Sequence, residues 1–465
     1  MRYLSPAFGP IIHSIGVREL QVDYAKEQLR PQQVVDLVLE RIAARGEDAV
    51  WISRRPDREL RQRATELDRI RRERGTAGMP LFGVPCAVKD NIDVAGLATT
   101  AACPAFSYRP TRNAGSVQRL LDAGAIVIGK TNMDQFATGL TGTRSPYGSC
   151  QSVFAGGLIS GGSSSGSAVA VAAGLVSFAL GTDTAGSGRV PAALNGIVGC
   201  KPTRGLVSTA GVVPACRSLD CVSIFTADVG DVATVLAAVR GFDHADVWSQ
   251  HVSGDANYSH HRHSRVRFAV PEPTELDFEG DGAMREAFDV ALARAAEDVS
   301  DITLTTIAPL LEAGELLYHG PWVAERLAEL EEFLAEHPED VLPITRQVIE
   351  SGKGFDAVAT FRAWHRLMEL RCWTDQLWHR TELLIMPTVP TTFTVDEIAE
   401  EPVRRNTVLG RYTQFVNPLD LAALTVPTGR TADGRPASVT LIGPAFSEPL
   451  LLSVGTRLTT CWSTT

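Results

Sequence analysis

Amphipathic stretches and short apolar runs alternate along the first part of the chain. Residues 31–46 begin with proline and end with glycine around an amphipathic pattern, which predicts a helix. Residues 58–74 predict a second, highly charged helix that ends before Gly75. A β-branched run at 125–130 predicts a buried strand, and it follows a helical pattern over 116–123.

The same alternation continues through the second half of the chain. Short strands that alternate with helices predict an α/β fold with a mixed or mainly parallel sheet. The expected helices cover 281–298, 321–336, 340–352 and 356–380, and the expected strands cover 383–388 and 437–443.

The composition is that of an ordinary globular protein, with 44% hydrophobic and 21% charged residues. A net charge of −10 argues against nucleic acid or an anionic membrane surface as the partner, but it is compatible with a small anionic substrate. No apolar stretch reaches the roughly 18 residues of a membrane span, and the N-terminus lacks the pattern of a signal peptide. We therefore expect a cytoplasmic protein without a membrane partner.

The sequence does not indicate a metal or nucleotide site. The eight cysteines have no metal-ligand spacing, so we expect mostly buried, inert thiols. His260, His261 and His263 lie in a polar, turn-rich stretch over 249–265, which predicts a solvated connection rather than a metal site. Because the chain also lacks a phosphate-binding loop and a dinucleotide fingerprint, we expect no cofactor.

Two glycine-rich loops that contain serine lie close together in the sequence. Residues 161–166 read GGSSSG, and residues 183–189 read DTAGSGR. Small residues let backbone N–H groups and a serine hydroxyl approach a substrate closely. The apolar stretch over 168–180 between the loops is long enough to predict a buried helix. A Gly/Ser linker is the alternative, but the apolar flanks and the second loop disfavour it.

The two loops resemble those of the amidase signature family, whose members hydrolyse carbon–nitrogen bonds of carboxamides. Ser163 and Ser187 lie 24 residues apart, as in the family, and Lys89 in FGVPCAVKDN matches the family's lysine motif. The resemblance extends from about Leu20 to the C-terminus. It implies a large twisted mixed sheet wrapped by helices, with Lys89 as base, Ser163 as bridging serine and Ser187 as nucleophile. It also implies a cis peptide bond between Gly162 and Ser163.

This chemistry requires a neutral Lys89. A serine hydroxyl is a weak nucleophile until a base removes its proton, and a lysine is such a base only when it is uncharged. Burial lowers the pKa of a lysine, and the apolar segment over 84–88 favours burial here. Asp90 would act in the opposite direction, because a nearby carboxylate favours the ammonium form. A surface lysine is the alternative for this motif taken alone.

The second loop also supplies candidates for stabilising negative charge. A tetrahedral intermediate needs hydrogen-bond donors for its oxyanion, and backbone N–H groups beside the nucleophile can provide them. The candidate donors are the N–H groups of Thr184, Ala185, Gly186 and Ser187.

Four other residues of the second loop differ from the usual family pattern or flank the nucleophile. Ala185 and Gly188 stand where glycine and a larger apolar residue are usual in the family, and we expect Gly188 to leave room beside the nucleophile. Asp183 and Arg189 flank the loop, and we expect them to hold its shape rather than to react.

With these departures the chain resembles the allophanate hydrolase branch of the family, as do its stretches GTRSPYG and FVNPLDLA. In that branch a tyrosine and an arginine around a Gly-Pro-Trp sequence hold the substrate, which points to Tyr318 and Arg326 here. An arginine fork suits a planar carboxylate. The alternative for Arg326 is a surface ion pair with Glu325 or Glu329.

The resemblance therefore implies hydrolysis of allophanate, a carboxylated urea, to ammonia and N-carboxycarbamate, which decays to CO₂. The alternatives are an amidase for another small amide (biuret, malonamate or an aryl-acetamide), a subunit of a tRNA-dependent amidotransferase, and a catalytically silent scaffold. We expect a small anionic amide as substrate, a homodimer, and enzymes of the same pathway as further partners.

The expected organisation has an N-terminal helical arm over 1–75 and an amidase signature domain over 76–465. Longer relatives carry a C-terminal accessory domain, which we do not expect in this chain. The amidase domain is expected to consist of a core over 76–230, a helical substrate-binding insertion over about 266–380 and a closing core segment over 381–465.

Overall fold

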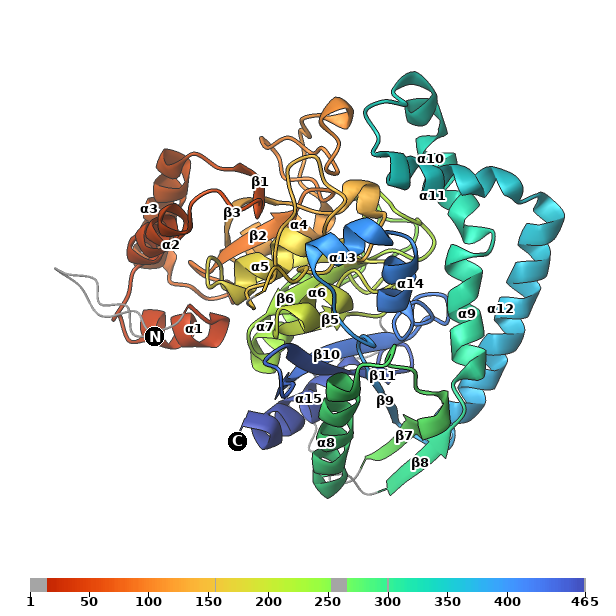
Figure 1. The fold of residues 1–465 in the computed structure, drawn as a ribbon. Coiled ribbons are helices and arrows are strands. Elements are labelled where there is room, and N and C mark those ends of the chain that lie inside the picture. The colour runs from red at the N-terminus through yellow and green to blue at the C-terminus, as the bar shows by residue number, and fades with distance from the viewer. Residues whose placement is uncertain (1–14, 155, 252–265, 299–300, 464–465) are drawn as a thin grey trace.

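A mixed sheet runs through the middle of the molecule (Figure 1). The structure is a computed structural model that describes residues 15–154, 156–251, 266–298 and 301–463. The strands are β1 (Trp51–Arg54), β2 (Pro85–Lys89), β3 (Ile126–Thr131), β4 (Phe178–Asp183), β5 (Val198–Lys201), β6 (Cys221–Thr226), β7 (Arg267–Pro271), β8 (Asp301–Thr305), β9 (Leu383–Pro387), β10 (Ala422–Arg430) and β11 (Pro436–Gly443).

Within the described residues the sheet has eleven strands in the order β1-β3-β2-β4-β6-β5-β10-β11-β9-β7-β8. The pairs β2–β3, β2–β4, β7–β8 and β7–β9 are parallel, and the remaining neighbours are antiparallel. The predicted α/β fold with a large mixed sheet is therefore confirmed.

Helices surround this sheet, and several pack directly on it. α5 contacts β2, β3, β4 and β6, and α15 contacts β10 and β11. The helices are α1 (Val17–Ala25), α2 (Pro31–Arg45), α3 (Asp57–Arg74), α4 (Gly115–Asp122), α5 (Ser165–Ala172), α6 (Arg189–Leu194), α7 (Val229–Val239), α8 (Gly282–Asp298), α9 (Ala308–Tyr318), α10 (Trp322–Glu336), α11 (Pro343–Glu350), α12 (Ala357–Trp378), α13 (Val395–Glu400), α14 (Arg404–Gly410) and α15 (Glu448–Ser463).

The helices expected over 31–46, 58–74, 281–298, 321–336 and 356–380 are confirmed to within two residues at each end. The helix expected over 340–352 is shorter, because α11 begins only at a proline, which is favoured in a first helical turn, and gives way to a 3₁₀ turn. The histidine-rich part of the stretch over 249–265 lies outside the described residues.

The apolar stretch between the two serine loops is not a single helix. α5 ends at Ala172, and Gly174 follows with a φ of 66°, a left-handed conformation that glycine adopts without strain. From Phe178 the chain forms β4, which pairs with β2 and β6. The predicted helix over 168–180 is therefore wrong in its second half, because pairing with distant strands determines the structure of this apolar run.

The sheet register brings the two halves of the candidate site together. β2 and β4 are parallel neighbours in which Val88 pairs with Leu180, so both strands end at the same edge. Every residue of β2 and β4 is buried, which requires covering elements on both faces of the sheet. Lys89 therefore ends its strand beside the residues that lead into the second serine loop.

The helices α9 to α12 form one flank of the molecule (Figure 1). α9 packs against both α10 and α12. Phe333 of α10 makes edge-to-face contacts with Phe106 and Phe136, with ring centroids 5.2 and 5.7 Å apart. Because Phe136 precedes the segment that lines the candidate site, this aromatic cluster fixes α10 relative to that segment.

In the described ranges, no helix has the length and apolar character needed to cross a membrane. The same residues contain no cluster of three or more His, Cys, Asp or Glu side chains suited to a metal ion.

Among the described residues, six free cysteines are buried and Cys372 is exposed. Burial raises the pKa of the thiols of Cys86, Cys150 and Cys200.

Gly166, near the start of α5, gives a test of this packing. A side chain on Gly166 would collide with the carbonyl of Val50 and would lie 2.7 Å from the backbone nitrogen of Asn132. We expect Gly166→Ala to lower the free energy of unfolding by about 1–3 kcal/mol, measured by urea titration. Gly282→Ala is the matched control, because it lies at the start of α8 with open space around it and should not destabilise. Equal stability of the two variants would contradict this packing.

Candidate active site

Lys89 lies at the end of β2 and is fully buried. Its Nζ donates to Ser163 Oγ at 2.8 Å and to Thr182 Oγ1 at 2.7 Å. Ser163 lies in the first serine loop and Thr182 in β4. The structure thus brings Lys89 into direct contact with Ser163, which lies 74 residues away in the sequence.

The electrostatic surroundings favour the neutral form of Lys89. Burial is the largest influence, and it lowers the pKa of the Lys89 amine to about 7. The carboxylates of Asp134, Asp220 and Asp183 act in the opposite direction, and the Arg326 guanidinium adds to the lowering. A lysine with this pKa accepts and releases protons near neutral pH, as a general base requires.

Asp90 does not belong to these surroundings. Asp90 directly follows the last residue of β2, and its side chain contacts different residues from those that Lys89 contacts. Its carboxylate lies 3.4 Å from Lys130 Nζ and accepts the N–H of Thr100 at 2.9 Å. Asp90 therefore forms an ion pair with Lys130, and it does not hold Lys89 in the charged form as its place in the sequence suggested.

Asp134 holds the loop that carries Ser163. Its backbone N–H donates to the carbonyl of Ser163 at 3.1 Å. Its carboxylate accepts the N–H groups of Gly142 at 3.0 Å and Arg144 at 2.8 Å. Burial raises the pKa of Asp134, and Arg144 opposes that effect. The peptide bond between Gly162 and Ser163 is cis, as the resemblance implied.

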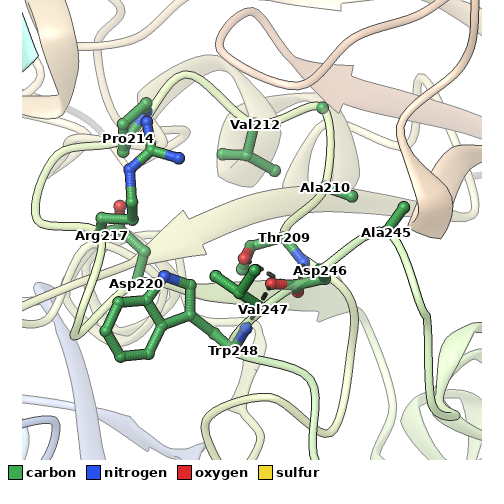
Figure 2. Close-up of a pocket in the computed structure, with 11 residues that line it drawn as sticks. Thr209, Ala210, Val212, Pro214, Arg217, Asp220, Ala245, Asp246, Val247 and Trp248 are labelled. Atoms are coloured by element: carbon green, nitrogen blue, oxygen red, sulfur yellow. Dashed lines mark hydrogen bonds between the residues drawn. The ribbon is translucent and has the colours of Figure 1, made fainter.

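Asp220 lies on the wall of a cavity of about 260 Å³ (Figure 2). Its carboxylate accepts the N–H groups of Ala215 at 2.8 Å and Cys216 at 3.1 Å, as well as the hydroxyl of Thr184. Burial is the largest influence on this carboxylate and raises its pKa to about 6, against the effect of these hydrogen bonds. Asp220 thereby connects the segment before β6 to the second serine loop.

Ser187 lies in the second serine loop and is almost fully buried. In the described part of the chain its hydroxyl makes no hydrogen bond, so the Ser163–Ser187 contact implied by the resemblance is not formed here. Such contacts are often long in unliganded enzymes and shorten when substrate binds.

Three of the four candidate oxyanion donors are free. The N–H of Gly186 donates to Asp183 Oδ1 at 2.9 Å, so the structure corrects its assignment as a donor to substrate. The N–H groups of Thr184, Ala185 and Ser187 make no hydrogen bond to any described residue. An oxyanion hole needs this combination of fixed geometry and unoccupied donors.

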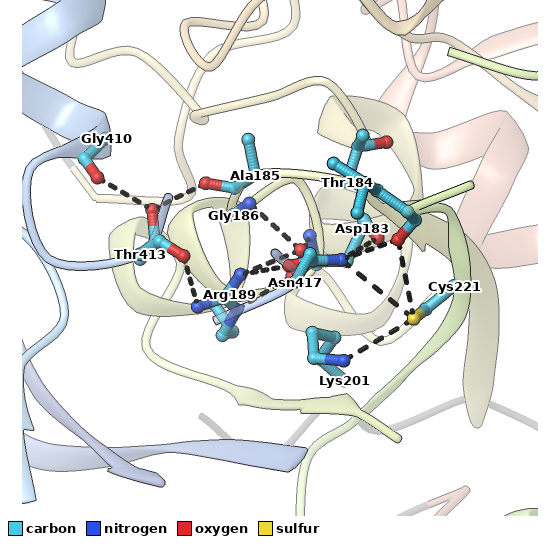
Figure 3. Close-up of polar contacts among 12 residues, drawn as sticks. Asp183, Thr184, Ala185, Gly186, Arg189, Lys201, Cys221, Gly410, Thr413 and Asn417 are labelled. Atoms are coloured by element: carbon cyan, nitrogen blue, oxygen red, sulfur yellow. Dashed lines mark hydrogen bonds and ion pairs between the residues drawn. The ribbon is translucent and has the colours of Figure 1, made fainter. Parts of the chain in front are cut away.

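Asp183 and Arg189 stabilise the second serine loop (Figure 3). They form a fully buried ion pair at 2.8 Å, and Asp183 also accepts the N–H of Gly188 at 3.0 Å. Arg189 donates onward to the carbonyl of Thr413 at 2.8 Å and to Asn417 Oδ1 at 3.1 Å. Burial is the largest influence and would raise the pKa of Asp183, but Arg189, Lys201 and the N–H of Gly188 together outweigh it, and the pKa is lowered. The expected shape-holding role of this pair is confirmed.

The segment after α14 closes the same loop from the other side. Thr413 Oγ1 donates to the carbonyl of Ala185 at 2.8 Å, and Asn417 Nδ2 donates to the carbonyl of Asp183 at 2.8 Å (Figure 3). Gly186 has a φ of 133°, and a side chain there would collide with Thr413. Glycine is therefore required at this position both by the backbone and by the packing.

Gly188 does not leave room beside the nucleophile, which corrects the prediction from sequence. A side chain there would lie 2.6 Å from Ser223 Cβ of β6 and 3.1 Å from Asp183 Oδ2. The space is already filled by the sheet. Gly188 is instead explained by the close approach of the loop to β6.

Arg326 reaches the candidate site from the second turn of α10 and is 5% exposed. Its Nε donates to the carbonyl of Ala215 at 3.0 Å, and its Nη1 donates to Thr138 Oγ1 at 2.7 Å. No carboxylate among the described residues forms an ion pair with it.

The alternative of a surface ion pair for Arg326 is excluded. Glu325 accepts the N–H and hydroxyl of Ser218 at 2.7 and 2.6 Å, and Glu329 forms a bidentate ion pair with Arg217. Both glutamates are therefore engaged elsewhere.

Tyr318 and Arg144 lie close to Arg326. Burial raises the pKa of the Tyr318 hydroxyl, while Arg326 and Arg144 act to lower it. Arg144 donates to the carbonyls of Thr138 and Pro402, each at 2.9 Å, and it has no ion-pair partner within the described chain. Two buried guanidinium groups thus approach Thr138 without an ion pair to any described carboxylate, a combination suited to an anionic ligand.

Several residues of this site carry no distinctive signal in the sequence. Thr182, Asp134 and Asp220 act through contacts with residues far along the chain, so periodicity does not indicate them. Arg144 lies in the GTRSPYG stretch, and its position in that stretch is the one available signal.

The chain is similar to several known proteins. A family model described as Amidase matches residues 33–452. A urea amidolyase of Lachancea kluyveri is 42% identical over 88% of this chain and 22% of its own length. A glutamyl-tRNA(Gln) amidotransferase subunit of Natronomonas pharaonis is 34% identical over 82% of this chain and 96% of its own length. The structure of Kluyveromyces lactis allophanate hydrolase matches with a TM-score of 0.90 and 39% identity, over 97% of this chain and 73% of that chain.

The chain spans about a fifth of the length of the urea amidolyases that it matches. The family match nevertheless covers most of the chain and includes Lys89, Ser163 and Ser187. The chain belongs to the Amidase family.

Proposed function

We propose that the chain is an allophanate hydrolase, which converts allophanate (urea-1-carboxylate) to ammonia and N-carboxycarbamate. The observation that carries this proposal is the buried Arg326 guanidinium, which lacks a carboxylate partner in the described chain and influences the pKa of Lys89. A buried cation is costly unless an anion pairs with it, and the carboxylate of allophanate is such an anion. The likeness to an allophanate hydrolase of known structure supports the proposal.

The first half of the reaction follows from the contact between Lys89 and Ser163. Neutral Lys89 accepts the proton of Ser163 while Ser163 accepts that of Ser187, and Ser187 Oγ bonds to the carbon of the terminal amide. The free N–H groups of the second serine loop donate to the oxyanion. The relay then returns a proton to the leaving nitrogen, the C–N bond breaks and ammonia departs.

The second half repeats the relay with water. Water attacks the carboxycarbamoyl ester on Ser187, and its proton passes back through Ser163 to Lys89. The ester bond breaks, Ser187 regains a proton, and N-carboxycarbamate leaves. This product then decays to CO₂ and further ammonia.

Tyr318 and Arg326 are the proposed ligands of the substrate carboxylate. An arginine fork forms two parallel charge-assisted hydrogen bonds with a planar carboxylate, which sets both affinity and orientation. The tyrosine hydroxyl would add one further donor.

A component of a tRNA-dependent amidotransferase is the second candidate, favoured by the match to nearly the whole length of such a protein. Glutaminase activity that appears only with partner subunits would support this candidate. Biuret, malonamate and aryl-acetamides are the small amides against which allophanate is compared in steady-state assays.

We also propose that the chain acts in the cytoplasm as a homodimer, near enzymes that supply its substrate. The urea amidolyases, in which a related segment is part of a much longer chain, support an association with other activities. Light scattering on the purified chain tests the dimer. The division into an arm over 1–75 and an amidase domain over 76–465 is proposed alongside it.

Ser187→Ala should abolish the covalent step without disturbing the fold. Ammonia release from allophanate should fall by at least about a thousandfold, while the thermal unfolding midpoint stays unchanged. Ser351→Ala, at an exposed serine outside the site, is the control and should retain full activity. Normal turnover in Ser187→Ala would end the nucleophile assignment.

The pH dependence of kcat/KM should report the titration of Lys89. Because the neutral amine is the active form and its pKa is about 7, activity should rise through neutral pH and level off above it. About a tenfold increase is expected between pH 6 and 8, once non-enzymatic decay is subtracted. Lys89→Met should remove almost all activity at every pH. A profile that is flat from pH 6 to 9 would contradict the relay.

Arg326 separates allophanate from neutral amides. Removing one partner of a desolvated charge pair costs about 2–5 kcal/mol, so Arg326→Ala should lower kcat/KM for allophanate by roughly 30-fold or more. Turnover of a neutral small amide should change far less. Arg326→Lys should recover part of the loss, and Tyr318→Phe should show a milder form of the same pattern. Equal losses for charged and neutral substrates would show that Arg326 supports the fold instead.

A further inference from the structure

One short segment contacts both sides of the candidate site. This bridge segment, residues 215–220, precedes β6 and follows the loop that lines the cavity in Figure 2. Asp220, at the end of this segment, is buried, with 4% of its surface exposed. The Asp220 carboxylate has no cationic ion-pair partner in the described chain, so hydrogen bonds alone hold it.

On the nucleophile side, Asp220 holds the loop that contains Ser187. The hydroxyl of Thr184, three residues before Ser187, donates to Asp220 Oδ1. Asn417 adds a second connection, because its Nδ2 donates both to the carbonyl of Asp183 at 2.8 Å and to that of Leu219 at 3.0 Å. The bridge segment and the second serine loop are therefore connected at two points.

On the substrate side, the bridge segment holds the start of α10. Asp220 Oδ2 accepts the N–H of Ala215, and the carbonyl of Ala215 accepts a hydrogen bond from Arg326 Nε at 3.0 Å. Glu325, next to Arg326, accepts the N–H and hydroxyl of Ser218. The Asp220 carboxylate thus contacts Thr184, which belongs to the oxyanion loop, and also Ala215, which contacts the Arg326 guanidinium.

We propose that Asp220 is a positioning residue that sets the distance between the oxyanion donors and the Arg326 guanidinium. It holds the former through Thr184 and the latter through Ala215. The proposal rests on the proposed function, because a fixed distance between these two groups matters for a short substrate that carries a carboxylate at one end and the reacting amide at the other.

The substitution Asp220→Asn interrupts this arrangement with little change in shape. A carboxylate accepts hydrogen bonds at both oxygens, whereas an amide accepts at one and presents an NH₂ donor at the other. With its oxygen toward the N–H groups of Ala215 and Cys216, the amide turns its NH₂ group toward the Thr184 hydroxyl, which accepts it. Both contacts then lose the charge assistance of the carboxylate, so both sides of the bridge are weakened.

The same substitution removes a negative charge close to Lys89. The charged groups that act on Lys89 are Asp134, Asp183, Asp220 and Arg326, and Asp220 is among those that raise its pKa. Loss of this charge lowers the pKa of Lys89 further, so the rising limb of the pH–activity profile should move to lower pH. The position of this limb reports the lost charge, whereas the labelling rate and KM report the two sides of the bridge.

The experiment compares Asp220→Asn with Asp246→Asn in the full chain. Asp246 is a matched control on the wall of the same cavity: it is 7% exposed and accepts the N–H of Thr209 at 2.6 Å, the hydroxyl of Thr209 at 3.0 Å and the N–H of Trp248 at 2.9 Å (Figure 2). It contacts neither side of the site in the described chain. Each variant is assayed for ammonia release and for the rate at which a fluorophosphonate labels Ser187.

We expect Asp220→Asn to slow fluorophosphonate labelling by about tenfold, because the bond that supports the oxyanion loop through Thr184 is weakened. KM should rise for allophanate but not for propionamide, and the limb of the pH profile should shift downward. Asp246→Asn should change none of these quantities. An Asp220→Asn variant that loses only thermal stability, with labelling rate, KM and pH limb unchanged, would overturn the proposal.

Thr184→Val keeps the proposal testable if Asp220→Asn does not fold. It removes only the hydroxyl bond to Asp220, so labelling should slow while KM for allophanate stays unchanged. An unaltered labelling rate would overturn the proposal. A wild-type chain that is labelled at Ser187 but releases no ammonia from allophanate would instead overturn the proposed function, and the labelling comparison would still test Asp220.

Discussion

The burial of one amine at the end of a central strand is the constraint on which the site depends. Lys89 is fully enclosed, and loss of hydration lowers its pKa to about 7 although three carboxylates act against this. One of these three, Asp183, is paired with Arg189, which offsets part of its charge. Asp90, which follows Lys89 in the sequence, is paired with Lys130 instead. If Asp183 lost its cation, its uncompensated charge would favour the ammonium form of Lys89 more strongly.

The second serine loop is held from parts of the sequence that lie more than 200 residues away. Thr413 and Asn417 contact it from the segment after α14, and both bonds are 2.8 Å long. Arg189 ties the same segment to Asp183 (Figure 3). The loop therefore acquires its shape only when the C-terminal part of the sheet is in place, and its free N–H groups are prepared before substrate arrives.

Local motifs indicate the chemistry, whereas distant contacts determine much of the geometry. Lys89 and Ser163 are indicated by local signals, namely the motif FGVPCAVKDN and the 24-residue spacing between Ser163 and Ser187, which resemble those of the family. The helix expected over 168–180 is half wrong, because strand pairing with β2 and β6 outweighs the propensity of an apolar run. Gly188 suggests open space only until its neighbour Ser223, on β6 and distant in sequence, is in place. A periodic pattern contains no information about such partners.

The most direct test of the account is the pKa of the Lys89 amine itself. The chain has only five lysines, Lys26, Lys89, Lys130, Lys201 and Lys353, so ¹³Cε-lysine labelling gives a spectrum simple enough to assign with Lys89→Met and Lys130→Met. A pH titration followed by NMR should show the Lys89 signal changing with a midpoint near 7. A midpoint at the ordinary value of about 10.4 would mean that Lys89 is charged at neutral pH and cannot be the base.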